Sequence, residues 1–62
     1  MQWMELTAEE FPSARDTAEG VCLLPIGCIE RHSTHLPLGT DQIIVDEVAR
    51  RAAELEPAVV FP

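Results

Sequence analysis

Lysine is missing from this chain of 62 residues, and only four arginines stand against eleven acidic residues, which leaves a net charge of −7. A P-loop is excluded, because that loop needs a lysine for the phosphates, and Gly27 and Gly39 are too far apart to belong to one. Four scattered arginines also cannot form the basic patch that attracts a phosphate backbone or an anionic bilayer. We therefore expect neither nucleic acid nor a membrane as a partner.

Long apolar runs and a disulfide framework are missing as well. No run approaches the roughly 20 residues that a membrane span requires. No signal peptide precedes the two cysteines, Cys22 and Cys28, so free thiols and a cytoplasmic location are expected. The 47% share of hydrophobic residues is typical of a globular chain. A length of 62 residues allows one small domain at most, which buries only about 60% of its unfolded surface and is marginal unless it associates.

The first twenty residues are predicted to form an amphipathic cover. Residues 1–6 suit an edge strand or a packed arm. Thr7 and Glu10 have capping-box spacing, which predicts a helical turn after Thr7. A short helix is expected from Pro12 to about Ala18, and Gly20 should end it.

The remainder has the pattern of a strand, a loop, a helix and a second strand. Val21–Ile26 is a continuous apolar run of the kind found in strands buried on both faces. Gln42–Leu55 is predicted to be a helix with Thr40 as its N-cap, and Ala58–Phe61 a further strand. This order predicts one βαβ unit with parallel strands in one sheet. Such a unit, which stops within a strand, suits the opening of a larger α/β domain, so residues 1–62 are interpreted as a single partial domain.

The predicted helix has an apolar side and a charged side. Four residues at helical spacing should form its buried stripe: Ile44, Val48, Ala52 and Leu55. Acid-before-base spacing predicts two ion pairs on the solvated face: Asp46 with Arg50, and Glu47 with Arg51.

The loop between the first strand and the helix carries the candidate chemistry. Ligands of open α/β sheets bind beyond the carboxyl ends of the strands, which is where this loop lies. Glu30 and His32 are two residues apart and can face one point, and Asp41 at the start of the helix can turn its carboxylate toward them. Such oxygen and nitrogen donors suit Zn, Mn or Fe(II) better than Ca or Mg. Asp41 can equally be an acid favoured by the helix dipole, and His35 a half-buried histidine or a group that holds a ligand in place.

The cysteines have less specific interpretations. Cys28 is expected first as a packing residue, second as a neighbour of the metal, and only third as a nucleophile, because Glu30 disfavours a thiolate. Cys22, inside the apolar run, is predicted to be a core residue.

One stretch, from Leu24 to Asp41, resembles the opening signature of the creatininase (creatinine amidohydrolase) family. It reads Leu-Pro-Ile-Gly-Cys-Ile-Glu-Arg-His-Ser-Thr-His-Leu-Pro-Leu-Gly-Thr-Asp. The family signature runs approximately Leu-Pro-x-Gly-Ser-x-Glu-Gln-His-Gly-Pro-His-Leu-Pro-x-x-Thr-Asp, and the match extends without a gap over eighteen residues. The segments before and after it also look like the family's first elements, so the resemblance covers nearly the whole chain.

The resemblance implies a three-layer α/β/α domain with a parallel sheet, often in a homohexamer. It also implies a dinuclear metal centre, with Zn or Mn and sometimes Fe, that hydrolyses non-peptide C–N bonds of small cyclic amides or related substrates. By position, Glu30 would bind one metal, His32 the other, and Asp41 would bridge the two. The family supplies its other ligands and its catalytic histidine from later strands, so no catalytic residue is assigned to residues 1–62.

Three departures from the signature have physical consequences. Arg31 replaces a glutamine and should point away from the metals. Ser33 and Thr34 replace a Gly-Pro pair, and a positive φ at Ser33 would cost roughly 1 kcal/mol or more. These changes affect substrate choice more than metal binding.

Three functions follow as alternatives. The first is the N-terminal segment of a creatininase-type, metal-dependent amidohydrolase that is inactive without the remaining ligands. The second is a non-catalytic α/β fragment that packs or associates. The third is a small module that binds metal through Glu30, His32 and Asp41 without turnover.

Overall fold

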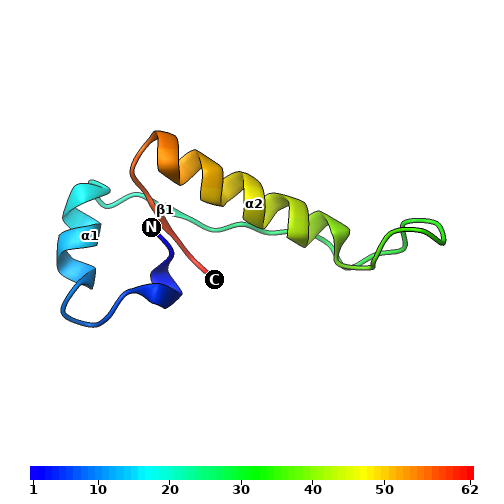
Figure 1. Cartoon of the computed structure of the whole chain (residues 1–62), viewed down its shortest axis with the longest axis horizontal. Coiled ribbons are helices and arrows are strands. Elements are labelled where there is room, and N and C mark those ends of the chain that lie inside the picture. The colour runs from blue at the N-terminus through cyan, green and yellow to red at the C-terminus, as the bar shows by residue number, and fades with distance from the viewer.

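The computed structural model describes all residues from Met1 to Pro62. The elements follow in the order η1 (Trp3–Glu5), α1 (Phe11–Thr17), β1 (Cys22–Leu23), α2 (Thr40–Leu55) and β2 (Val59–Val60) (Figure 1). The molecule is elongated, 44 × 22 × 13 Å, because a long loop extends beyond the beginning of α2. The predicted α/β class and the order strand, loop, helix, strand are confirmed.

The sheet is parallel, as predicted, with β2 at its centre. Cys22 of β1 pairs with Val59, and Leu23 with Val60. On the other edge of β2, Gln2 forms a parallel bridge with Val60, and the Val60 amide donates to the Met1 carbonyl at 2.7 Å. The N-terminal arm therefore pairs as an edge strand over a very short length.

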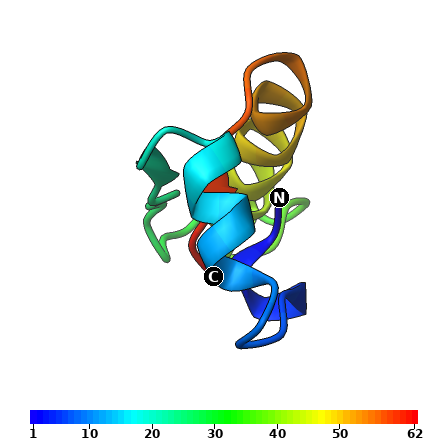
Figure 2. The ribbon, with the colours of Figure 1, turned by 90° about the vertical axis from the view of Figure 1, so that its left-hand side faces the viewer.

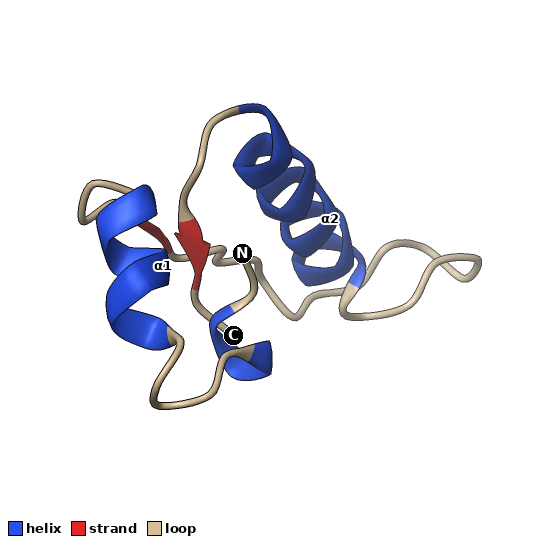
Figure 3. Cartoon of the chain, turned by 60° about the vertical axis from the view of Figure 1, so that its left-hand side comes forward, coloured by secondary structure: helices blue, strands red, loops and turns tan.

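Two helices cover opposite faces of this sheet. Successive side chains of a strand point to opposite faces, so the two neighbouring valines of β2 contact different helices. Val60 packs with the α2 residues Ala49 and Ala53. Val59 packs with the α1 residue Ala14 and with Ala18 that follows it. Figures 2 and 3 show the strands between α1 and α2. The early cover helix was thus predicted correctly, and the chain contains a small part of an α/β/α arrangement.

The first strand is shorter than predicted. Only two of the six residues in the apolar run are in β1, and Val21, Leu24 and Ile26 are exposed by half or more. Cys22 is also exposed, so the prediction that it belongs to the core is wrong. The physical reason is that a strand is buried on both faces only where other elements cover both, and here the helices pack mainly on β2.

The buried stripe of α2 lies one residue away from the predicted one. Its contacts with the sheet come from Ala49 and Ala53, whereas the predicted residues Ile44, Val48 and Leu55 are 57%, 59% and 88% exposed. Small alanines allow the helix to approach the strands closely, and this decides the rotation of the helix about its axis. The helix begins at Thr40 with Gly39 as its N-cap, so the predicted cap at Thr40 is also wrong. No helix of the structure is both long and apolar enough to cross a membrane.

The charged face of α2 is centred on Glu47. The predicted pair with Arg51 is present at 2.8 Å, but Arg50 binds Glu47 at 2.7 Å and Glu54 at 2.8 Å instead of Asp46. Asp46 accepts a hydrogen bond from the Gln42 amide at 2.9 Å. Hydrogen bonds from Arg50, and next from Arg51, lower the pKa of Glu47 from its ordinary value of 4.5 to about 2.

We expect a Glu47→Gln variant to lose part of the acid sensitivity of the fold. A carboxyl whose folded pKa is depressed contributes stability above its unfolded pKa, and this contribution disappears as the pH falls from about 4.5 toward 2. Chemical unfolding followed by circular dichroism should therefore show a smaller loss of stability over this pH range in the variant. Glu9→Gln removes the same charge where no ion pair exists and is the control. Equal acid sensitivity of all three chains would contradict the prediction.

Candidate metal centre

The loop that was predicted to carry the chemistry lies beyond the carboxyl end of β1 and beside the first turn of α2. It folds back on itself as a narrow hairpin. The Glu30 amide donates to the Leu38 carbonyl at 3.0 Å, and His32 forms an antiparallel bridge with Leu36. Figure 1 shows this hairpin projecting past the start of the helix. Glu30 and His32 therefore lie at the base of the hairpin, near Asp41 in the first turn of α2.

The loop is joined to the helix by Gly27 and Gln42. The Gly27 amide donates to Gln42 Oε1 at 2.8 Å, and Gln42 Nε2 donates to the Pro25 carbonyl at 3.3 Å. A Cβ on Gly27 would lie only 2.5 Å from the Gln42 nitrogen and 2.6 Å from the Asp41 carbonyl carbon. Only glycine permits this approach of two backbones. This contact sets the distance between the loop and Asp41.

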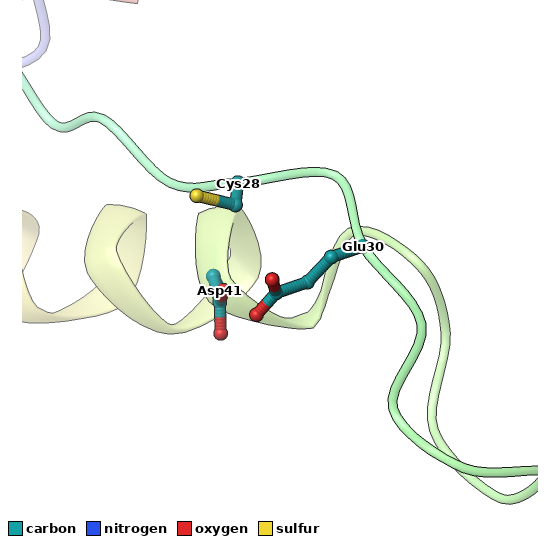
Figure 4. Close-up of side chains that lie close together, drawn as sticks. All are labelled: Cys28, Glu30 and Asp41. Atoms are coloured by element: carbon teal, nitrogen blue, oxygen red, sulfur yellow. The ribbon is translucent and has the colours of Figure 1, made fainter.

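Three donor side chains converge at this junction. Cys28 Sγ, one carboxylate oxygen of Glu30 and one of Asp41 all lie within 4.8 Å of one another. In Figure 4 the Glu30 carboxylate extends back toward Asp41 on the helix, and Cys28 lies on the adjoining loop segment. The cluster therefore combines two segments that are more than ten residues apart in the sequence.

His32 approaches the same two carboxylates. Its Nε2 is 3.5 Å from Asp41 Oδ1 and 3.9 Å from Glu30 Oε1, and its side chain is only 21% exposed. Nε2 itself is buried and has no hydrogen-bond partner. A buried polar atom without a partner costs about 1–3 kcal/mol, so such an atom needs an explanation.

These donors fit a divalent ion. Nitrogen and oxygen ligands at about 2.1 Å from a tetrahedral metal lie roughly 3.4 Å apart, close to the 3.5 Å between His32 Nε2 and Asp41 Oδ1. An ion between them would also provide the partner that Nε2 lacks. Imidazole, carboxylate and thiol donors together suit a transition metal better than Ca or Mg. The separation of His32 and Asp41 is therefore compatible with two ligands of one ion, and no hydrogen bond joins the pair.

The other polar residues of the hairpin lie outside this cluster. His35 is exposed, so the prediction of a half-buried histidine is wrong, and no hydrogen bond joins it to Glu30, His32 or Asp41. Arg31 is exposed and forms no ion pair with the site carboxylates, as expected. Ser33 has φ of 57°, the strained conformation that replacement of a glycine predicts.

Two features of the site were not evident in the sequence. Cys28 is exposed and belongs to the donor cluster, so its first interpretation as a packing residue is wrong and the second, as a metal neighbour, agrees with the geometry. Gln42 had no assigned role in the sequence analysis. Its side chain accepts a hydrogen bond from the backbone amide of Gly27, fifteen residues earlier, and no local sequence pattern predicts such a contact. Asp41 lies in the first turn of α2, as predicted, and also faces the cluster.

Comparison with known proteins identifies the family of the chain. The family model described as Creatininase: Creatinine amidohydrolase matches residues 4–62. A creatinine amidohydrolase of Pseudomonas putida is 33% identical over 58 residues, which cover 94% of this chain and 22% of that protein. The chain therefore spans about a fifth of the length of this curated relative. No solved structure matches. Because the family match includes the loop, Asp41 and both strands, the chain belongs to the creatininase family.

Proposed function

We propose that residues 1–62 are the N-terminal part of a metal-dependent amidohydrolase that cleaves non-peptide C–N bonds in cyclic amides or related small molecules. Membership of the creatininase family and the amidohydrolase name of the relative support the reaction class. The metal is zinc or manganese, with iron as a further candidate. A homo-oligomer, a hexamer by family resemblance, and a cytoplasmic location stay predictions.

The observation that carries the proposal is the unpartnered His32 Nε2 beside two carboxylates. Glu30 would hold one ion and His32 the other, and the Asp41 carboxylate would be shared between them. Each carboxylate has two oxygens, so one side chain can contact two ions. The first turn of α2 holds Asp41, and the base of the hairpin holds the other two ligands.

In this proposal the chain positions and partly neutralises the metal centre. When bound, a pair of ions supplies Lewis-acid polarisation of the amide carbonyl and a water of lowered pKa. The carboxylates of Glu30 and Asp41 balance part of the positive charge. The contact between Gly27 and Gln42 holds the loop against the first turn of α2, which contains Asp41. The family resemblance places the other ligands and the catalytic histidine on later strands, so residues 1–62 alone should bind metal without turnover.

Native mass spectrometry of the 62-residue chain with zinc or manganese tests whether residues 1–62 bind metal. We expect a bound ion at micromolar metal, and hydrolysis of cyclic amides by the polypeptide in which residues 1–62 occur. A chain that binds neither metal at that concentration, and a polypeptide without metal-dependent hydrolysis, would refute the proposal.

Association without catalysis is a second candidate, favoured by the small core. Only seven of the 62 residues are buried, and the exposed side of α2 carries Ile44, Val48 and Leu55. Apolar side chains so arranged are expected to be covered by other protein surface. Sedimentation of the chain, with and without zinc, separates the candidates. Association that is independent of metal, together with the absence of metal binding, would favour this function over the first.

A further inference from the structure

We propose that Cys28 supplies a thiolate to the ion that Glu30 and Asp41 hold, so that this position takes zinc in preference to manganese. The inference rests on the proposed function, because it concerns the same metal centre. It adds a ligand to the three that the family resemblance implies.

The geometry places the thiol among donors and not in the core. Cys28 Sγ lies within 4.8 Å of carboxylate oxygens of both Glu30 and Asp41. In a tetrahedral zinc site, sulfur and oxygen ligands are roughly 3.6 Å apart, so the sulfur and each carboxylate oxygen need to approach by about 1.2 Å at most. Cys28 is exposed, so its side chain can rotate toward the carboxylates without a packing contact in the way.

The buried Nε2 of His32 points to an ion beside the same pair of carboxylates. It lies beside the same two carboxylates and has no hydrogen-bond partner. The thiol and the imidazole therefore share the same carboxylates. This arrangement gives each of two ions a mixed donor set, with sulfur and oxygen for one and nitrogen and oxygen for the other.

Charge explains why the thiol would act only with a metal. A bound divalent cation is the largest local charge, and it deprotonates a coordinating thiol outright. As the metal–sulfur bond forms, the S–H bond breaks and its proton passes to solvent. Thiolate ligands select zinc, whereas manganese prefers oxygen donors, so the metal preference follows from Cys28.

Protection from alkylation tests the inference within one molecule. Iodoacetamide should modify both cysteines of the metal-free chain, because both are exposed. With zinc, Cys28 should react at least about tenfold more slowly while Cys22 in β1, which is outside the donor cluster, reacts as before. Peptide mass spectrometry measures both rates. Cobalt(II) should in addition give a thiolate-to-metal charge-transfer band that disappears in Cys28→Ser and remains in Cys22→Ser.

Affinity completes the test. Cys28→Ser should weaken zinc binding by at least the 10–100-fold that loss of an outer-shell partner costs, and change manganese binding much less. Zinc binding that requires His32 but leaves Cys28 fully reactive would overturn this inference and leave the proposed metal centre intact. Absence of zinc binding would overturn both.

Discussion

Replacing Gly27 with alanine should destabilise the chain by about 1–3 kcal/mol and at the same time weaken metal binding. The new Cβ would meet backbone atoms of Asp41 and Gln42 at 2.5–2.7 Å, and backbone cannot move aside as a flexible side chain does. The loop must therefore shift from α2, which breaks the Gly27–Gln42 hydrogen bond and separates Glu30 from Asp41. Urea unfolding and a zinc titration measure the two effects.

Gly39→Ala is the matched control for this prediction. A Cβ at Gly39 would meet only the Ile29 side chain at 3.8 Å, an ordinary contact, and φ at this residue is −91°. The loss of a glycine N-cap should cost only about 0.5 kcal/mol and leave metal affinity unchanged. If Gly27→Ala behaved like Gly39→Ala in both measurements, the contact between the loop and α2 would not position the site.

Replacing His32 with alanine should reduce metal affinity by more than the 10–100-fold that loss of an outer-shell partner costs, without unfolding the chain. The variant removes a nitrogen ligand, and with it a buried atom that has no hydrogen bond to lose. The free energy of unfolding of the metal-free chain should therefore stay within about 1 kcal/mol of the original value. Calorimetric titration with zinc and with manganese, and urea unfolding, provide the measurements.

The same substitution at His35 separates the role of position 32 from the general effect of losing a histidine. His35 is exposed and outside the donor cluster, so His35→Ala should bind metal as the unmodified chain does. Unchanged metal content in His32→Ala would contradict the proposed site. Equal losses in both variants would show that the hairpin binds metal differently from the geometry described above.

The elements were predictable because their signals are local. The run of apolar residues before Gly27 predicted a strand there, and helical spacing predicted α2 to within two residues of its observed start and at its observed end, Leu55. The metal cluster was predicted from the types and spacing of Glu30, His32 and Asp41 in a loop after a strand, and the structure brings these three side chains together. Their binding of metal stays a prediction.

The errors concern burial, which depends on partners distant in the sequence. Ile44 and Val48 were assigned to the core because they are apolar at helical spacing, yet the sheet contacts the alanine stripe beside them. Cys22 was assigned to the core for the same reason, but β1 has only one neighbouring strand. Helical spacing of apolar residues shows that one side of a helix is apolar. It does not show which side of the helix contacts the sheet.

For this protein, residue type and spacing alone determined the βαβ order, the place of the loop and the candidate ligands Glu30, His32 and Asp41. Only the tertiary structure decided that Cys28 joins them and that His32 Nε2 is left without a partner. The physical reason is that both facts depend on how closely the loop approaches α2. That distance is set by the contact of Gly27 with the backbone of Asp41 and Gln42, which no local pattern encodes.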